Sequence, residues 1–246
     1  MTIALTVTIT TALMTLLLSS PIITSMAQQQ QSSDSDFAIT IVSHSLIDAG
    51  SGITNIVGEV RNDSPEKIGW VQVSGKFYDS AGQLIHLADG PVQLGELRPG
   101  EKGPFGIYID DAAVSEGIAN YTLSAGLDSD FLQDKPAALK VGVGKHGMVE
   151  RGVELPLYQV IGNVTNTGNL PAESVDVIAT FYDAAGNIVD FDATVTSPST
   201  IPAGQSADFI IVTLVGDYGN WTAEMQSIAS VNATAESSEY LAIMVP

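Results

Sequence analysis

The feature that most constrains this chain is an internal repeat. When the sequence is compared with itself at an offset of 104 positions, residues 57–62 (VGEVRN) fall on residues 161–166 (IGNVTN). Further along, residues 77–82 (FYDSAG) fall on residues 181–186 (FYDAAG), and no gap is needed between the two matches. A self-match held at one offset predicts two copies of a single folding unit.

Each copy carries the two-residue alternation of a β-strand. In residues 71–78 (VQVSGKFY) apolar or small side chains alternate with polar ones. Residues 175–182 (VDVIATFY) repeat the pattern, except that Ile178 is an apolar residue on the polar face. A helix would need a sustained pattern of apolar positions three and four residues apart, whereas these windows follow the alternation of a strand. We therefore expect strands here, with Phe77 and Phe181 buried.

Both strands run into a turn with the sequence Asp-x-Ala-Gly, at residues 79–82 and 183–186. The aspartate carboxylate can accept a hydrogen bond from a backbone N–H two residues later. The glycine supplies the positive φ that lets the chain reverse. Because another extended segment follows at once, each copy is expected to contain a β-hairpin at this point.

Short strands separated by turn residues every ten positions or so indicate an all-β chain of two tandem immunoglobulin-like antiparallel β-sandwiches. The expected organisation is a signal peptide at 1–27, a flexible polar segment at 28–35, β-sandwich repeat 1 at 36–130, a linker at 131–137, β-sandwich repeat 2 at 138–235 and a C-terminal tail at 236–246.

Beyond the gapless span the register of the repeat changes. Residues 120–122 (NYT) fall on residues 220–222 (NWT) at an offset of 100, which we interpret as a surface loop shortened by four residues. On this alignment the two aromatic residues correspond, which favours a packing role for both. Trp70, whose counterpart is Ser174, is then the better candidate for an exposed interface residue.

The first 27 residues contain no charged side chain and end with the small residues Ser25 and Ala27 around Met26. This pattern is typical of a cleaved export signal, so the rest of the chain is expected to be extracytoplasmic, either secreted or associated with the cell surface. The alternative is an uncleaved anchor, because the apolar segment is long enough to span a bilayer. Contact with a membrane is expected only through this segment, and only if it is retained.

Composition excludes several classes of function. Nine Lys and Arg against 28 Asp and Glu give a formal net charge of −19, which repels phosphate backbones and excludes a nucleic-acid partner. The chain has no cysteine, which excludes disulfides, thiolate metal sites and a cysteine nucleophile. Stability must therefore come from burial of a core.

The motif residues resemble those of the FxLYD domain family. The motif reads GKFYD at residues 75–79 and ATFYD at residues 179–183, without the separate x-Leu that the family has before Tyr. The family is similar to other immunoglobulin-like modules of exported prokaryotic proteins, including the CARDB type. The resemblance implies a sandwich fold in which the motif residues are architectural, and it transfers no catalytic residue. These residues are Phe77, Tyr78, Asp79, Gly82, Phe181, Tyr182, Asp183 and Gly186.

The chain offers few candidates for catalysis. His44 and His146 fall at comparable places in the first strand of each copy, and His86 is the third histidine. A shared metal site would need His44 and His146 to face one another across the domains, whereas the simpler interpretation is strand histidines without a ligand. No Gly-x-Ser-x-Gly elbow occurs. We therefore expect no enzyme activity, no catalytic residue and no cofactor.

Two kinds of modification or ion site remain as hypotheses. Asp128, Asp130 and Asp134 flank the expected linker and are weak candidates for calcium, although solvated acidic loops are the favoured interpretation because the Asp-x-Asp-x-Asp-Gly order is missing. Sequons suitable for glycosylation begin at Asn120, Asn163, Asn220 and Asn232. The sequon at Asn62 is disfavoured because Pro65 follows it.

These observations predict a non-enzymatic exported protein whose modules bind an extracytoplasmic protein or envelope component that the sequence does not identify. One alternative is a membrane-anchored structural spacer. A second is a calcium-stabilised adhesion module.

Overall fold

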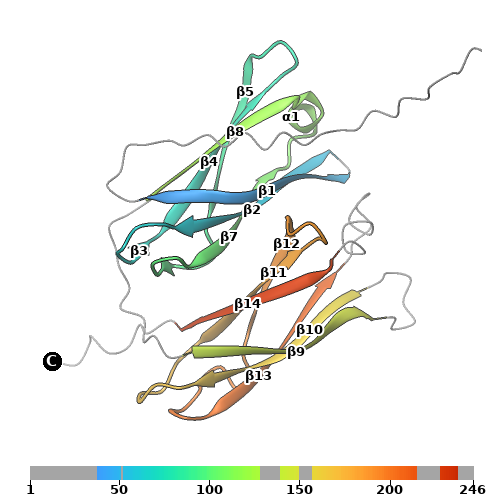
Figure 1. The fold of residues 1–246 in the computed structure, drawn as a ribbon. Coiled ribbons are helices and arrows are strands. Elements are labelled where there is room, and N and C mark those ends of the chain that lie inside the picture. Colours follow the sequence, from blue (N-terminus) through green and yellow to red (C-terminus); the bar gives the residue numbers. More distant parts are fainter. Residues whose placement is uncertain (1–37, 51, 128–138, 150–156, 215–227, 238–246) are drawn as a thin grey trace, which may run out of the picture.

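The computed structural model describes residues 38–50, 52–127, 139–149, 157–214 and 228–237. Most of these residues lie in antiparallel strands, which form two successive all-β modules (Figure 1). The expectation of an all-β chain is confirmed. The expected signal segment, linker and most of the tail lie outside the described residues.

Module 1 is built from eight strands and one short helix. A sheet of order β1-β2-β7 packs on a sheet of order β5-β4-β8, and β3 and β6 form a two-stranded sheet. The elements are β1 (Ile39–Gly50), β2 (Ile53–Asn62), β3 (Ile68–Gly69), β4 (Val71–Tyr78), β5 (Leu84–Pro91), β6 (Glu96–Leu97), β7 (Lys102–Ile109), α1 (Ala112–Gly117) and β8 (Asn120–Leu127).

Module 2 repeats this plan with sheets of order β9-β10-β13 and β12-β11-β14. Its strands are β9 (Leu139–Val149), β10 (Leu157–Asn166), β11 (Val175–Tyr182), β12 (Ile188–Val195), β13 (Ser206–Leu214) and β14 (Ser230–Ser237). The last strand continues to Ser237, two residues past the expected end of the repeat.

The β2–β7 and β4–β5 registers of module 1 recur in module 2 at the 104-residue offset. Val57 lies opposite Gly106 across β2 and β7, and Ile161 lies opposite Ile210 across β10 and β13. The register shift after Phe77 in the β4–β5 pair recurs after Phe181 in the β11–β12 pair. Because a shift of one residue would turn every side chain to the other face, this agreement shows that equivalent positions face the same way.

The alternation read from the sequence places the core correctly. Phe77 and Phe181 are both 0% exposed, each in the middle of its own module's apolar cluster. Phe105 on β7 and Phe209 on β13 face them from the opposite sheet of each sandwich and are equally buried. Each module therefore has a core of its own, which a chain without cysteine requires.

Both Asp-x-Ala-Gly turns form the expected hairpins. The Asp79 carboxylate accepts from the backbone N–H of Ala81 and Gln83, at 2.9 and 2.8 Å. The carboxylate of Asp183 accepts from the equivalent amides in the second turn. Gly82 and Gly186 have φ of 77° and 83°, as such a reversal requires.

The register expected for the end of the repeat is wrong. Tyr78 pairs with Asn120 at the start of β8, whereas the equivalent Tyr182 pairs with Ser230 at the start of β14. The last strands are thus 110 positions apart rather than 100, so the second copy has gained residues before its last strand instead of losing four. Trp221 lies outside the described residues, and the strand position equivalent to Tyr121 belongs to Val231.

A buried asparagine ends the second strand of each module. The Asn62 side-chain amide donates to the carbonyls of Glu66 and Leu97, and its Oδ1 accepts from both the backbone N–H and the hydroxyl of Ser64. Asn166 repeats the same arrangement with Leu170, Ile201 and Gly168. Each asparagine therefore joins the end of a strand to two loop carbonyls, one of them at a buried hydrogen bond.

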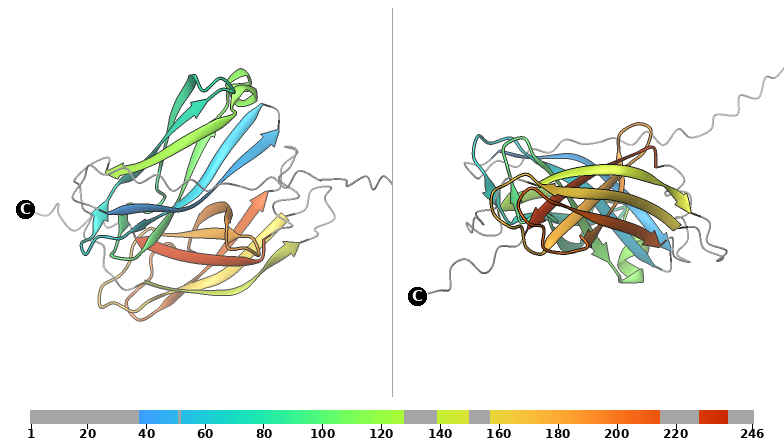
Figure 2. Two further views of the ribbon diagram at one scale, coloured as in Figure 1. Left: turned by 45° about the horizontal axis from the view of Figure 1, so that its top comes forward. Right: turned by 90° about the horizontal axis from the view of Figure 1, so that it is seen from below.

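The sheets of the two modules lie in a stack. The β1-β2-β7 sheet has its own core on one side and the β12-β11-β14 sheet of module 2 on the other (Figures 1 and 2). This leaves the β5-β4-β8 sheet at one end of the stack and the β9-β10-β13 sheet at the other (Figure 1). Among the described residues, no helix has the length and apolar character needed to cross a bilayer.

Candidate functional site

The outer face of the β1-β2-β7 sheet is buried although it points away from its own core. Ile56 and Val60 of β2 point into module 1, so the intervening positions point outward. Two of these outward residues, Val57 and Glu59, are nevertheless only 3% and 2% exposed. Module 2 covers them, and this covered face is the most specific contact surface in the described chain.

Glu59 occupies the centre of this contact. Its Oε1 accepts from the hydroxyl of Tyr182 in module 2 at 2.6 Å, and its Oε2 accepts from Nζ of Lys102 at 2.8 Å. A buried carboxylate is costly unless it is paired in this way. Burial and the neighbouring Glu59 raise the pKa of Tyr182 well above its ordinary value, so the phenol stays protonated and donates to the carboxylate.

Two serines of β1 attach the backbone of β12 to module 1. The Ser45 hydroxyl donates to the carbonyl of Ile188 at 2.7 Å. The Ser43 hydroxyl oxygen accepts from the N–H of the same residue at 3.2 Å. Gly106 on β7 allows a close approach, because a Cβ built there would lie 3.0 Å from Cζ of Phe191. The two modules are therefore joined by hydrogen bonds and by close packing.

The contact also explains the apolar exception in the repeat pattern. Ile178 lies on the face of β11 that points away from the module 2 core, yet it is buried and belongs to the apolar cluster of module 1. Its counterpart at the same offset is Ser74 on the uncovered sheet of module 1. The break in alternation was the one sequence signal of this interface.

The equivalent outer face of module 2 is uncovered. Asn163, which stands where Glu59 stands in module 1, is exposed. Ile210 and Val212, which stand where Gly106 and Tyr108 stand, are 52% and 39% exposed. This face of the β9-β10-β13 sheet, which we call the lower face, consists of outward positions on three strands: Lys140, Lys145, Gln159, Ile161, Asn163, Thr165, Ser206, Asp208, Ile210 and Val212.

The opposite end of the stack is also uncovered. Leu84 and Leu87 on β5 are 51% and 61% exposed and stand where Ile188 and Phe191 make the contact between modules. Tyr78 stands at the position of Tyr182. This face of the β5-β4-β8 sheet, which we call the upper face, consists of Gln72, Ser74, Lys76, Tyr78, Leu84, Leu87, Asp89, Pro91, Asn120, Thr122, Ser124 and Gly126.

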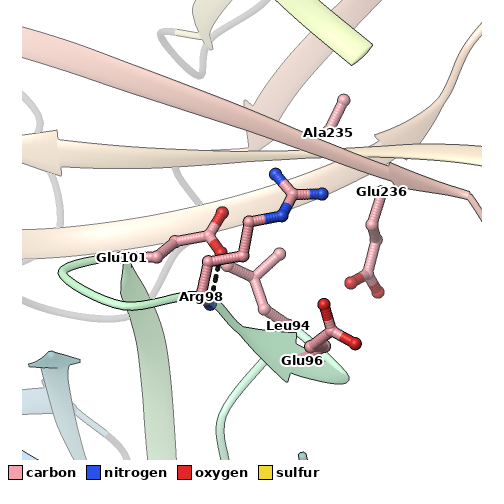
Figure 3. Close-up of a pocket in the computed structure, with 6 residues that line it drawn as sticks. All are labelled: Leu94, Glu96, Arg98, Glu101, Ala235 and Glu236. Atoms are coloured by element: carbon pink, nitrogen blue, oxygen red, sulfur yellow. Dashed lines mark hydrogen bonds between the residues drawn. The ribbon is translucent and has the colours of Figure 1, made fainter. Parts of the chain in front are cut away.

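A small recess lies beside the contact (Figure 3). Leu94, Glu96, Arg98 and Glu101 line it from module 1, and Ala235 and Glu236 line it from β14. Oε2 of Glu236 accepts from the N–H of Gly95 at 3.2 Å, a further link between the modules. Glu96 is buried with its Oε2 3.3 Å from Nζ of Lys67, while its Oε1 has no hydrogen-bond partner.

The recess lacks the geometry of a metal site. No group of three or more His, Cys, Asp or Glu in the described part of the chain could hold a metal ion. The weak calcium candidates Asp128, Asp130 and Asp134 lie outside the described residues, so the calcium hypothesis remains a prediction.

The two strand histidines do not form a shared site. Nδ1 of His44 is 2.8 Å from the hydroxyl of Tyr121, and Nδ1 of His146 is 2.7 Å from that of Tyr158. Each histidine is thus bound within its own module, and burial lowers the pKa of His44. Their positions are not equivalent either, because His44 pairs with Gly58 and His146 with Val160, two strand positions apart in the repeat.

The remaining candidates are distributed over the surface. Asn120, Asn163 and Asn232 are exposed, and Asn220 lies outside the described residues. Asn62, whose sequon we disfavoured, is 0% exposed. Trp70 is exposed, as expected, and adopts a positive φ of 43° that recurs in its counterpart Ser174.

Comparisons with known proteins give little beyond the fold class. No family model and no curated protein sequence matches the chain. Solved structures with some similarity include the D341A D367A calcium binding mutant of Bacteroides uniformis beta-glucuronidase 2, at 15% identity and a TM-score of 0.25 over 76% of this chain and 25% of that one. Red sea bream transglutaminase matches at 9% identity and a TM-score of 0.26, over 83% and 31% of the two chains.

The chain thus spans between a quarter and a third of the length of these two enzymes. At such TM-scores the matches carry no argument about what this chain does.

Proposed function

We propose that this chain is an exported, non-enzymatic protein of tandem FxLYD-type modules that binds an extracytoplasmic protein through the lower face of its second module. The observation that carries the proposal is the exposure of Ile210, at the position where Gly106 of module 1 packs against Phe191, with the exposed Val212 on the same strand. Apolar side chains grouped on one face of a sheet are typical of a protein interaction surface.

The structure of the covered face supports the proposed role. In module 1 the same strands already contact a folded β-module, with the buried Val57 next to a central polar group, Glu59. In module 2 the central polar group is Asn163, and Ile161, Ile210 and Val212 lie on the same face. An uncharged amide can accept and donate hydrogen bonds, so a partner is not required to neutralise it.

A structural spacer is the second candidate. The contact between the modules holds them in one arrangement through hydrogen bonds at both Glu59 and Ile188. A fixed arrangement of two modules would suit a stalk that separates a ligand from the cell surface. A retained N-terminal anchor would favour the spacer, whereas cleavage after Ala27 would favour a released or surface-associated binder.

Cross-linking on producing cells, followed by mass spectrometry, tests the binding proposal. We expect cross-links between the lower face and a partner to be lost in an Ile210→Asp variant. A Leu170→Asp variant is the matched control, because Leu170 is an exposed apolar residue on a loop away from this face. Equal cross-linking of the two variants would contradict the proposal. N-terminal sequencing of the exported form would decide between a binder and an anchored spacer.

A further inference from the structure

We propose that the partner of the lower face is the upper face of a second copy of this chain. This inference rests on the proposed function and identifies its binding partner. The contact between copies would repeat the contact between modules, with the β5-β4-β8 sheet of one copy placed where the β12-β11-β14 sheet lies on module 1. The four-sheet stack of one chain would then continue into the next.

Continuity with the contact inside the chain is the first argument. The β2–β7 and β4–β5 registers agree with those of β10–β13 and β11–β12, so contact residues on these strands have counterparts on the two end faces. On the first strand the bulges differ, and Ser43 and Ser45 correspond to Gly142 and Lys145. Glu59 and Tyr182, which hydrogen bond at the centre of that contact, correspond to Asn163 and Tyr78. A tyrosine hydroxyl can donate to an asparagine carbonyl as it does to a carboxylate. Tyr78 of one copy could therefore donate to Asn163 of the next, as Tyr182 donates to Glu59.

The size of the apolar residues changes in a compensating way. Inside the chain the large Phe191 packs against Gly106, which leaves room for it. On the end faces the corresponding residues are the smaller Leu87 and the larger Ile210, which are both exposed. One surface thus loses side-chain volume where the other gains it, which lets the two surfaces pack without a gap.

Charge does not oppose this association despite the net charge of −19. The lower face carries Lys140, Lys145 and Asp208, and the upper face carries Lys76 and Asp89. Each face therefore has both signs, and most of the acidic residues lie elsewhere on the chain. Like-charge repulsion is consequently small where the copies would meet.

A contact between two different faces is heterologous, so each copy keeps one free face after binding. Association can then continue into a chain of copies, or close into a ring if the rotation between copies permits it. A contact between two identical faces would instead stop at a dimer. This difference gives the proposal a distinctive test.

The test is light scattering of the purified protein after size exclusion, over a range of concentrations. We expect the wild type to form species larger than a dimer as concentration rises. Ile210→Asp and Leu87→Asp should each weaken association at least ~10-fold, since a charge would be buried at the centre of the contact. Leu170→Asp should associate like the wild type, and circular dichroism should show that all variants are folded.

Mixing the two face variants is the decisive measurement. The Leu87→Asp copy keeps an intact lower face, and the Ile210→Asp copy keeps an intact upper face. A mixture should therefore form a dimer with one copy of each, although neither variant associates alone. A mixture that stays monomeric would overturn the proposal, as would a wild type that stays monomeric or face variants that still associate.

The same experiments separate this inference from the proposed function. If the chain is monomeric while Ile210→Asp still loses its cross-links on cells, self-docking is wrong and the lower face binds another protein. If neither association nor cross-linking depends on Ile210, both proposals are wrong. A glycan on Asn163 in the exported protein, detected by intact mass, would overturn self-docking because it would cover the centre of the lower face.

Discussion

The hydroxyl of Tyr182 in module 2 donates to the carboxylate of Glu59 in module 1 across 2.6 Å, and Lys102 neutralises the other oxygen of that carboxylate. Glu59 is 2% exposed, so the hydrogen bond lies where water does not compete for it. A pairing of this kind fixes one module relative to the other, because displacement would leave a buried carboxylate without its partner.

Removal of the hydroxyl should weaken the contact between the modules. We expect Tyr182→Phe to lower the free energy of unfolding by about 1.5–3 kcal/mol, the usual contribution of a hydrogen bond to a charged group. Urea unfolding followed by intrinsic fluorescence measures this loss. Tyr78→Phe, at the equivalent position of the uncovered upper face, is the matched control and should change stability by less than about 0.5 kcal/mol in dilute protein.

Stability should also fall at alkaline pH. Burial and the neighbouring Glu59 raise the pKa of Tyr182 in the folded chain, whereas in the unfolded chain the phenol ionises near its ordinary value of about 10. The unfolded state therefore binds fewer protons above that pH, and the stabilisation that is complete below pH 10 is lost as the pH rises further. Burial likewise raises the pKa of Tyr121 and Tyr158.

Above about pH 10 the wild type should accordingly lose the stabilisation that each of these tyrosines provides. Tyr182→Phe should remove one of them, giving a shallower dependence of the urea midpoint on pH than the wild type has. Between pH 7 and 9 the difference between the two proteins should be constant. A wild type and variant with parallel profiles up to pH 11 would contradict the role of this tyrosine.

The two motif phenylalanines should contribute equally to the free energy of unfolding. Phe77→Ala and Phe181→Ala each remove a fully buried ring from a separate core and should cost about 3–5 kcal/mol. Thermal unfolding followed by calorimetry measures both losses, and Leu170→Ala, which removes an exposed side chain, is the control. A loss below 1 kcal/mol at either position would show that the ring does not support a core.

The buried asparagines should matter more than their exposed neighbours. Asn62→Ala and Asn166→Ala each remove the side-chain donor from two loop carbonyls, one of them at a buried hydrogen bond, and should cost about 1–3 kcal/mol. Asn163→Ala, an exposed asparagine on the adjoining strand segment, should be neutral in dilute protein. Equal effects at Asn163 and Asn166 would contradict the bonding described for the strand ends.

The parts of the fold that depend on local chemistry could be predicted from the sequence. Alternation placed Phe77 and Phe181 in the cores, and the carboxylate and glycine of each hairpin turn behaved as their chemistry requires. The last strand was misplaced because a three-residue match at Trp221 carries too little information to fix a register. The last strand of module 2 instead begins at Ser230, which pairs with Tyr182.

The contact between the modules could not be predicted, because it depends on how two finished sandwiches meet. Glu59 reads as an ordinary polar residue on the outer face of a strand, and its partner Tyr182 is 123 positions away. The one local signal was Ile178, an apolar residue on a polar face. The same limit applies to His44 and His146. They lie at similar places in the sequence, but β1 and β9 have their bulges at different points, so the two histidines are not at equivalent strand positions.

Ile178 therefore allows the contact to be tested without damage to either core. Ile178→Asp should place a charge against module 1 and separate the modules, because the side chain points out of module 2 into the apolar cluster of module 1. Small-angle scattering should report a larger radius of gyration, while circular dichroism should still report folded strands. Val177→Asp, one residue away but 0% exposed inside module 2, should instead unfold that module. Loss of folded strands in Ile178→Asp to the extent seen in Val177→Asp would show that Ile178 belongs to the module 2 core and not to the contact.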